Sequence, residues 1–552
     1  MTDRTVTAEP GAISRGQAHA GTMAQWLGRA RASTREHAIE IAVVVGLTVL
    51  AAALRLYNLE NLPAGLHGDE AWTGFDAQRI VEEGWIGVYV GSALGQPTGP
   101  LYLTALLFTF LPDDVWTIRL SMAIFGIAAL PATYAAARIM FGQVAATIAA
   151  LLLAVMVWHL HLSRVGFMVV SWTFVEMLAL WLLYLGMHRR SVLLCAAAGA
   201  VAGLGVYTYN AYLLFVPIPF VAIAWEFFRL PRDERREFAA RSVAFAMTMF
   251  IAALPLLLYI NDNTEFYREH QRVVGVTYSA AWRDEDIAGK ADILWARARE
   301  LNRGLLQGER PDFGDGLGDD GYPVLQPVLY VLAVVGLGIS AWRIRRSEYA
   351  VLVAAILLLP LGALLTVNDG MYRRTLGLAP FVAILAALPL AELWKAGARK
   401  GGGWRYASAA GVIIIAGYAG VRGTADYFGP MQDTRAMRFT FASELEDAAR
   451  YIDTLPDDTI VYFYSDRWPY GYETRRYLAP MQAGVDRSIE FRGDRGVSEP
   501  VDYGARRNNN IAFVFLGRYI GGEQEIARRF PAGTMTEARR DGRASFSAYY
   551  VP

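Results

Sequence analysis

The chain has 552 residues and no net formal charge; 54% of its residues are hydrophobic and only 19% are charged. Soluble domains carry about 25% charged residues, so this composition excludes a single soluble globule, a disordered chain and a collagen-like fibre. Without a basic excess to neutralise phosphates, no nucleic-acid partner is expected. The single cysteine, Cys195, excludes an internal disulfide framework and a cysteine-based zinc site.

Long apolar stretches dominate the first three quarters of the chain. A helix needs about 20 apolar residues to cross a bilayer, within a range of about 17–25. About eleven stretches meet or approach this length, which predicts an α-helical polytopic membrane protein. They are 38–57, 117–138, 142–162, 165–187, 191–209, 211–228, 242–260, 324–342, 349–367, 376–394 and 406–421. The first is marginal, because its uncharged part runs only from Ile41 to Leu54.

Basic residues in the short loops set the expected orientation, because cytoplasmic loops carry an excess of Lys and Arg. With the N-terminus inside, the predicted cytoplasmic loops hold fifteen basic residues and the short outer loops hold three. This arrangement predicts a cytoplasmic segment over 1–37 and a transmembrane domain over 38–421. Loops 58–116 and 261–323 and the tail 422–552 are then extracytoplasmic.

The tail is long enough to form a small domain of its own. Its hydrophobic pattern alternates between helical and strand-like stretches, which predicts an α/β fold. Asp541–Gly542 is typical of a hairpin turn. The expected elements are helices at Ser443–Thr454 and Glu523–Phe530 and strands at Thr459–Tyr464, Ile511–Leu516 and Ala544–Val551.

The first outer loop carries the densest group of acid–base residues, with His67, Asp69 and Glu70 just beyond the first apolar stretch. A lipid-linked substrate would present its head group at this level. Alternatively, Asp69 only caps the helix expected through Glu83, since Asp is a preferred N-cap. A helix N-terminus stabilises the ionised form, so Asp69 would have a low pKa and would be a weak base.

Other candidates have structural alternatives. Glu176 lies midway along an apolar stretch and is a functional candidate by default; alternatively it is a protonated or hydrogen-bonded residue between helices. His161, near the outer end of its stretch, could join His67 and Asp69 at a metal ion, although the spacing is not diagnostic, or it could form an interfacial hydrogen bond. Tyr209 could stack on a sugar or belong to the interfacial aromatic belt.

A loop rich in glycine carries four acidic residues between the seventh and eighth apolar stretches. They do not form a complete calcium-binding loop. We therefore interpret the segment as a solvated linker. The residues are Asp312, Asp315, Asp319 and Asp320.

Several short motifs occur in a familiar order. Asp69-Glu70 follows the first span, Pro-Thr-Gly-Pro-Leu-Tyr occupies 97–102, and Arg119 opens the second span. His-Leu-Ser-Arg at 161–164 closes the third span, and Gly-Leu-Gly-Val-Tyr-Thr-Tyr at 203–209 ends the fifth. In this order and spacing the chain resembles the GT-C superfamily of membrane glycosyltransferases. Within it, the chain is similar to family 39, which includes protein O-mannosyltransferases, the lipid A aminoarabinose transferase and lipopolysaccharide-core galacturonosyltransferases.

The resemblance implies transfer of a monosaccharide, with inversion, from a polyprenyl-phosphate sugar to a lipid, glycan or protein acceptor outside a bacterial inner membrane. It assigns Asp69 as the general base, with Glu70 orienting the site or assisting a cation; a divalent metal ion is a candidate cofactor. Outer arginines would stabilise the departing phosphate, unless they pair with nearby carboxylates or lipid headgroups. The candidates are Arg164, Arg268, Arg272, Arg373 and Arg374.

Three other classes remain as alternatives. A polymerase or ligase that uses a polyprenyl-diphosphate glycan also has many spans and outer arginines, although the Asp-Glu loop directly after the first span favours the transferase. A lipid flippase or transporter predicts inverted repeats and paired charges within the membrane, and the sequence shows neither. A surface-binding protein would use the tail as its binding module.

Overall fold

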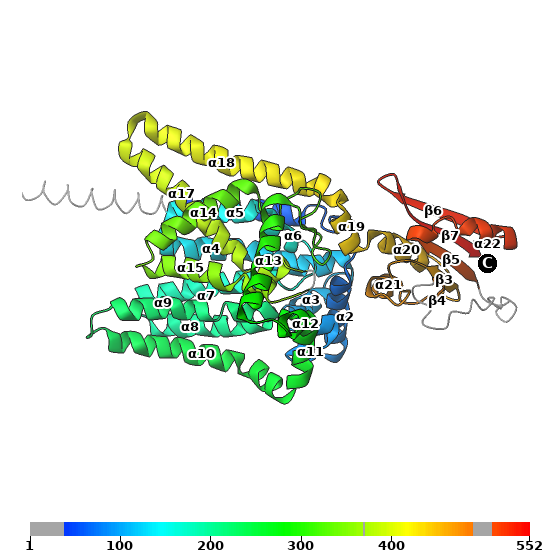
Figure 1. Ribbon diagram of the computed structural model, residues 1–552, viewed down its shortest axis with the longest axis horizontal. Helices are drawn as coiled ribbons and strands as arrows, with labels where there is room; N and C mark the ends of the chain where they lie inside the picture. Colours follow the sequence, from blue (N-terminus) through cyan, green and yellow to red (C-terminus); the bar gives the residue numbers. More distant parts are fainter. Residues whose placement is uncertain (1–37, 368–369, 489–509) are drawn as a thin grey trace, which may run out of the picture.

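The computed structural model describes residues 38–367, 370–488 and 510–552. The predicted N-terminal segment, 1–37, lies outside the described residues. The described chain forms a helical bundle and a separate sheet domain at one end of it (Figure 1). The predicted fold class, a polytopic helical domain followed by a C-terminal α/β domain, is therefore confirmed.

Each of the eleven predicted apolar stretches coincides with an apolar helix. Eight helical segments in the described chain are long and apolar enough to cross a membrane. They are Ala38–Leu56, Val115–Phe141, Val170–His188, Asn210–Arg229, Arg235–Asp262, Ser347–Leu364, Leu378–Lys400 and Gly402–Asp433. Three further apolar helices are shorter: Gln143–Val155, Val192–Tyr207 and Pro327–Trp342. This composition makes the chain an integral membrane protein.

Local changes of backbone conformation explain why two of these helices are shorter than the predicted stretches. The stretch predicted over 142–162 is interrupted at Met156, whose extended backbone separates α5 from α6. The stretch over 191–209 changes from an α-helix to a 3₁₀ turn at Gly205. The helices of the bundle are α4 (Val115–Phe141), α5 (Gln143–Val155), α6 (Val157–Leu162), α7 (Val170–His188), α8 (Val192–Leu204), α9 (Pro217–Arg229), α10 (Arg235–Asp262), α14 (Pro327–Trp342), α15 (Ser347–Leu358), α16 (Leu361–Leu364), α17 (Leu378–Lys400) and α18 (Gly402–Phe428).

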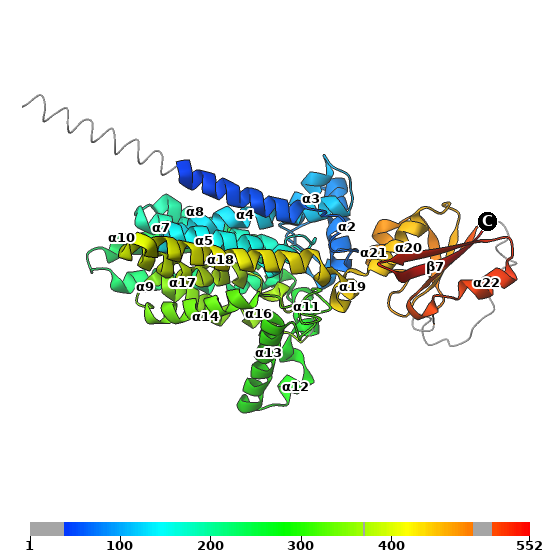
Figure 2. The same ribbon diagram turned by 90° about the horizontal axis from the view of Figure 1, so that it is seen from above.

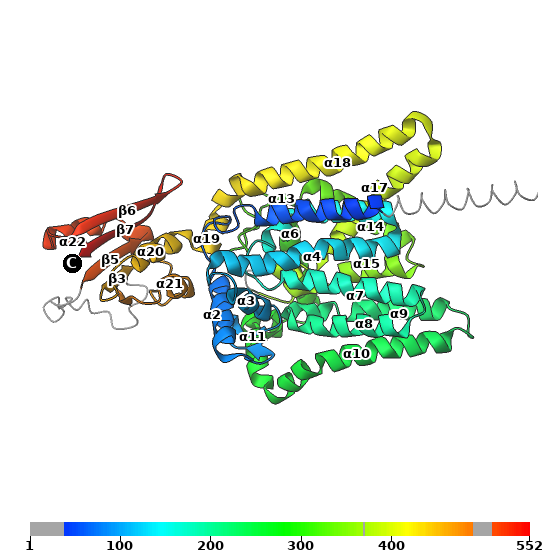
Figure 3. The ribbon, with the colours of Figure 1, turned by 180° about the vertical axis from the view of Figure 1, so that it is seen from behind.

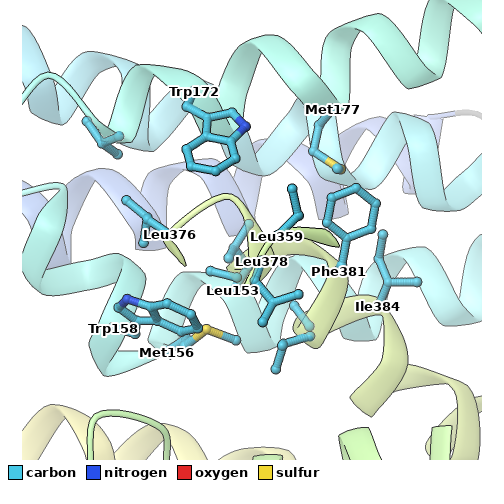
Figure 4. Packing of buried hydrophobic residues seen from close by; sticks show 14 of the residues in the cluster. Leu153, Met156, Trp158, Trp172, Met177, Leu359, Leu376, Leu378, Phe381 and Ile384 are labelled. Atoms are coloured by element: carbon cyan, nitrogen blue, oxygen red, sulfur yellow. The ribbon is translucent and has the colours of Figure 1, made fainter. Parts of the chain in front are cut away.

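The bundle packs tightly through both bulky and small residues. Figure 4 shows Met177 of α7 beside Phe381 of α17, the most buried of the long helices in the described chain. Helices α8 and α10 approach closely because Gly199 and Gly203 have no side chains. A Cβ at Gly199 would lie 2.0 Å from the Phe245 carbonyl oxygen. Small residues four apart are a common device for close helix contact in membranes.

The two long loops gather at the end of the bundle that carries the sheet domain (Figure 1). Loop 58–116 contains α2 (Gly68–Glu83), the short strands β1 (Tyr89–Val90) and β2 (Gln96–Pro97), and α3 (Leu101–Phe108). Loop 261–323 contains α11 (Thr264–Val274), α12 (Ala280–Arg283) and α13 (Ile287–Gln307). Helices α12 and α13 project from the bundle (Figure 2). The first helix, Ala38–Leu56, and α18 run along the bundle on the same side (Figure 3).

The C-terminal domain is a five-stranded sheet with the order β4-β3-β5-β7-β6. Strand β3 is parallel to β4 and β5, whereas β7 is antiparallel to β5 and β6. Alternate residues of β3 face opposite sides: Val461 packs in the cluster with α20, and Tyr462 in the cluster with α22. The elements are α19 (Arg435–Phe441), α20 (Ser443–Asp453), β3 (Ile460–Tyr464), α21 (Glu473–Leu478), β4 (Ala483–Asp486), β5 (Ile511–Leu516), α22 (Glu523–Arg529), β6 (Thr534–Arg540) and β7 (Arg543–Val551).

Candidate active site

Asp69 lies in the first turn of α2, at the bundle end next to the C-terminal domain. The helix is capped by His67, whose Nδ1 accepts the Asp69 backbone N–H at 2.9 Å, and the His67 backbone N–H donates in turn to Glu70 Oε2 at 3.0 Å. The alternative that Asp69 only caps the helix is therefore wrong, because His67 is the N-cap residue. Because His67 satisfies the capping role, the Asp69 side chain, 37% exposed, is directed to other partners.

The main partner of Asp69 is Arg373. The Nη1 of Arg373 donates to Asp69 Oδ2 at 2.6 Å, while its Nε donates to Asp315 Oδ1 at 2.6 Å. The guanidinium also lies over the Phe167 ring, 4.3 Å from its centroid. Arg373 thus bridges two carboxylates from distant parts of the chain, and its planar fork fixes their orientation. The neighbouring Asp369, a possible ion-pair partner from the sequence, lies outside the described residues.

Asp312 and Asp315 hold the backbone that carries Arg373. The carboxylate of Asp312 accepts the N–H groups of Gly370 and Met371 at 2.6 and 2.7 Å. Asp315 accepts those of Tyr372 and Arg373, each at 2.9 Å. Four successive amides are therefore bound by two fully buried carboxylates, and charge-assisted hydrogen bonds of this kind are stronger than neutral ones.

The interpretation of this loop as a solvated linker is consequently wrong for Asp312 and Asp315. Asp319 also has a structural contact, since its Oδ2 accepts the Ala436 N–H at 2.8 Å, whereas Asp320 is exposed. One signal for this contact is visible in the sequence, namely two aspartates three residues apart beside glycines. That pattern alone does not distinguish a solvated loop from one whose carboxylates bind the backbone N–H groups of another loop.

The electrostatic environment links these groups to Tyr209. Burial and the Asp312 carboxylate raise the pKa of Asp315 to about 7, although Arg373 opposes the shift. The two acidic partners raise the pKa of Arg373 despite its burial, so its guanidinium stays charged. Tyr209 lies beside the same charged groups, namely Arg374, Arg373, Asp315 and Asp69. Four residues proposed from the sequence, Asp69, Arg373, Arg374 and Tyr209, are therefore brought together.

A second group of arginines surrounds Arg374. Burial and the positive charges of Arg310 and Arg374 lower the pKa of Arg297 in α13. The buried Nε of Arg297 has no hydrogen-bond partner among the described residues. Arg374 donates to Thr366 Oγ1 at 3.1 Å. Mutual repulsion between cations favours an anion between them. Arg297 and Arg310 were not among the candidates from the sequence, because they lie far from the short motifs.

Glu70 and Arg119 form a fully buried ion pair beneath this site. Arg119 Nε donates to Glu70 Oε1 at 2.9 Å, and its other nitrogens donate to carbonyls of the first outer loop. Burial alone would raise the pKa of Glu70, but Arg119 and the N–H groups of His67 and Gly166 lower it. Glu70 is 0% exposed, so its carboxylate contacts Arg119 and the backbone of the outer loops rather than open space.

Arg164 and His161 are directed into the protein. Arg164 is fully buried, and its terminal nitrogens donate to carbonyls at the end of the first helix and in the following loop. This placement argues against the predicted phosphate contact. His161 is also buried, with Nε2 2.8 Å from the Asp315 carbonyl oxygen and Nδ1 3.3 Å from the Tyr427 hydroxyl. His161 therefore contacts the backbone of the loop that carries Asp315.

The remaining candidates lie apart from Asp69. Arg268 and Arg272 are exposed on α11, where Arg272 pairs with Glu265. Glu176 is fully buried in α7, and neither carboxylate oxygen has a hydrogen-bond partner among the described residues. The described residues contain no group of three or more His, Cys, Asp or Glu side chains placed to hold a metal ion. Between Asp69 and Asp315, the guanidinium of Arg373 occupies the position that a cation would take.

The C-terminal domain contacts the start of α2 directly. Thr474 at the start of α21 donates to the Leu66 carbonyl oxygen at 2.8 Å. The Tyr472 hydroxyl lies 3.0 Å from the position that a Cβ would take on Gly68. Burial, with smaller contributions from Asp69 and Glu473, raises the pKa of Tyr472 to about 12. The sheet domain thus forms one wall beside Asp69, which the sequence did not predict.

Comparisons with known proteins agree with this architecture. Residues 95–259 match the family described as dolichyl-phosphate-mannose-protein mannosyltransferase. The fold is similar to the Archaeoglobus fulgidus oligosaccharyltransferase, with a TM-score of 0.53 at 15% identity over 81% of this chain and 64% of that chain. It is also similar to ArnT from Cupriavidus metallidurans bound to undecaprenyl phosphate, with a TM-score of 0.52 at 14% identity over 92% and 97% of the two chains.

The chain has the GT-C fold. The superfamily resemblance inferred from the motifs is confirmed. This GT-C chain spans less than two thirds of the length of the archaeal enzyme, and no curated protein matches it. Asp69, Asp315 and Arg373 lie outside the matched segment 95–259, so their arrangement is evidence independent of the family match.

Proposed function

We propose that this GT-C protein transfers a monosaccharide from a polyprenyl-phosphate sugar to a lipid, glycan or protein acceptor. The observation that carries the proposal is the group formed by Asp69, Arg373 and Asp315 next to the arginines around Arg374. Support comes from the ligands named for two proteins with the same fold. ArnT was solved with undecaprenyl phosphate, and AglB from Archaeoglobus fulgidus, similar at a TM-score of 0.51, with an inhibitory peptide and a dolichol-phosphate.

In the proposed reaction Asp69 takes the proton of the acceptor hydroxyl. The acceptor oxygen attacks the anomeric carbon, and the bond from that carbon to the phosphate oxygen breaks on the opposite face, which inverts the configuration. Asp69 Oδ2 accepts from Arg373, so in this proposal Asp69 takes the proton late, once the bond from the anomeric carbon to the phosphate is largely broken. Polyprenyl phosphate leaves with the bonding electron pair.

Arg374, Arg297 and Arg310 are assigned to the departing phosphate. Negative charge grows on the phosphate as its bond to the sugar breaks, so fixed cations stabilise the transition state more than the ground state. Arg373 cannot do this as readily, because Asp69 and Asp315 already neutralise it. In this proposal Tyr209 contacts the sugar or the phosphate.

The proposed location is a bacterial inner membrane, with the N-terminus in the cytoplasm. Asp69, α13 and the C-terminal domain then lie on the outer side, as the distribution of basic residues predicts. The C-terminal domain is proposed to border the acceptor site through Tyr472.

The test has two parts. Mass spectrometry of lipid extracts from a deletion strain should detect an accumulated polyprenyl-monophosphate sugar; accumulation of a diphosphate-linked glycan would favour the polymerase or ligase instead. Binding of undecaprenyl phosphate to the purified chain should weaken about tenfold in Arg374→Gln and stay unchanged in Arg268→Gln. The reverse result would move the phosphate site to α11.

A further inference from the structure

Residues at the ends of α7 and α9 and at the starts of α10 and α15 line a cavity of about 370 Å³. These helix ends lie at the end of the bundle opposite the C-terminal domain (Figure 1). It is outside the site proposed above and is not needed for sugar transfer. Polar and charged side chains from all four helices line it, including Tyr184, Arg190, Arg229, Arg241, Arg346 and Ser347.

Each of the four arginines has a carboxylate within 4.0 Å. Arg190 lies 2.8 Å from Glu234, Arg346 lies 3.0 Å from Glu348, and Arg229 lies 3.8 Å from Glu226. Arg241 differs. Its side chain is only 8% exposed, and its closest carboxylate, at 3.9 Å, belongs to Glu237, which is itself 74% exposed. The charge of Arg241 is therefore poorly compensated by the protein.

The Arg241 guanidinium also has an unused donor. Its buried Nε has no hydrogen-bond partner among the described residues. A buried donor without a partner costs about 1–3 kcal/mol, so a ligand that accepts from it gains affinity. A helix N-terminus adds to the positive potential, because α15 begins at Ser347 on the cavity wall with no hydrogen bond from the side chain of its capping residue, Arg346.

The surface beside the cavity is apolar. Large side chains of α8, α9 and α10 next to it are exposed, as expected for residues that face lipid tails rather than water. They are Val192, Leu193, Phe228, Val243 and Met247. A ligand with a negative head and apolar tails would satisfy both parts of this surface.

We infer that this cavity binds the phosphate headgroup of an anionic glycerophospholipid from the leaflet opposite Asp69, with Arg241 donating to a phosphate oxygen. Basic pockets between transmembrane helices are suited to such headgroups. The carboxylates of Glu226, Glu234 and Glu348 limit the net charge of the cavity, so it accommodates one phosphate group rather than a highly charged ligand.

The experiment uses the purified full chain in phosphatidylcholine nanodiscs or matched detergent micelles. Added phosphatidylglycerol should raise Tm and appear as a bound lipid in native mass spectra, whereas phosphatidylcholine should not. Arg241→Gln should weaken phosphatidylglycerol binding about tenfold. The matched control is Arg236→Gln, an exposed arginine on the same helix, which should bind as the wild type does.

Three results would overturn the inference. Equal binding of phosphatidylcholine would show that the cavity does not select negative charge. Equal stabilisation by inorganic phosphate would show that the ligand is a free anion rather than a lipid. Unchanged phosphatidylglycerol binding in Arg241→Gln would remove the assigned residue. If Arg241→Gln fails to fold, the half-exposed Arg229→Gln serves instead, with a weakening of about threefold expected and unchanged binding again contrary to the inference.

Discussion

The Nη1 of Arg373 donates to Oδ2 of Asp69 across 2.6 Å, although 304 residues separate the two in the chain. The same guanidinium donates to Asp315, and Asp315 accepts the Arg373 backbone N–H. Arg373 is therefore fixed from both its backbone and its side chain. The position of the Asp69 carboxylate is consequently set by a loop near residue 312, far from α2 in sequence.

Asp69→Asn should abolish sugar transfer. The amide keeps the size of the side chain but cannot accept a proton, and general-base catalysis contributes about 10²- to 10⁴-fold to rates. Turnover with the native lipid-linked donor should fall by that range while Tm changes little. Glu82→Gln, an exposed carboxylate on the same helix, is the matched control. Near-normal turnover in Asp69→Asn would show that another group is the base.

Arg373→Lys should reduce turnover at least tenfold. Lysine carries the same charge, but its compact ammonium cannot reproduce the planar fork that reaches Asp69 and Asp315 together. One carboxylate then loses its partner and moves. Steady-state kinetics should show the loss mainly in kcat. A variant with wild-type kcat would mean that the bridging geometry does not matter for the reaction.

Asp315→Asn tests whether the hydrogen bonds from the Tyr372 and Arg373 backbone N–H groups to Asp315 position the loop that carries Arg373 and Arg374. Loss of its negative charge weakens the hold on two backbone amides, so undecaprenyl phosphate affinity and turnover should each fall about tenfold. The exposed Asp320→Asn should be neutral.

The pKa of Asp315 is raised to about 7. As the pH falls below 7, we therefore expect turnover to fall and the stability of the folded protein to rise. Below pH 7 the protonated carboxyl releases Arg373, so turnover falls. The folded state binds this proton more tightly than the unfolded state, so the group's contribution to stability rises as pH falls from about 7 to 4. Asp315→Asn should flatten both profiles; an unchanged activity profile would exclude Asp315 as the titrating group.

Glu70→Gln should destabilise the protein at pH 7 by about 3–5 kcal/mol, because it leaves the buried charge of Arg119 without its partner. The pKa of Glu70 is lowered from 4.5 in the folded protein. The stability difference between the wild type and Glu70→Gln is therefore complete above pH 4.5, and it is lost as the pH falls through the lowered pKa of Glu70. Free energies of unfolding measured in detergent at pH 7 and below pH 4 should show the two proteins converging. A constant difference would contradict an ionised pair.

Gly74→Ala should loosen the contact between α2 and the C-terminal domain. A Cβ at Gly74 would lie 2.5 Å from the Tyr477 ring and 2.9 Å from Ile118, and overpacking typically costs about 1–3 kcal/mol. Limited proteolysis should release the C-terminal domain faster than in the wild type. Gly417→Ala is the control, because no atom lies within 4 Å of its added Cβ. Equal proteolysis rates would show that this contact does not hold the domain.

Some parts of this protein follow from local sequence. Apolar length predicted all eleven apolar helices, and alternation of hydrophobic residues predicted β3, β5 and β7 within a residue or two of their ends. These features are local, because a bilayer-length run or a two-residue period needs no distant partner to be recognised. The acidic first turn of α2 and the adjacent arginines of the loop at 373–374 were visible for the same reason.

The roles of those charges were decided only by tertiary packing. Arg164, Arg373 and Arg374 are equivalent in sequence, but packing directs Arg164 to backbone carbonyls, Arg373 to two carboxylates, and Arg374 to a group with Arg297. Asp315 looks solvated in the sequence and is fully buried in the fold. The energy of a charge depends on its burial and on partners hundreds of residues away, and these are properties of the folded chain rather than of any segment.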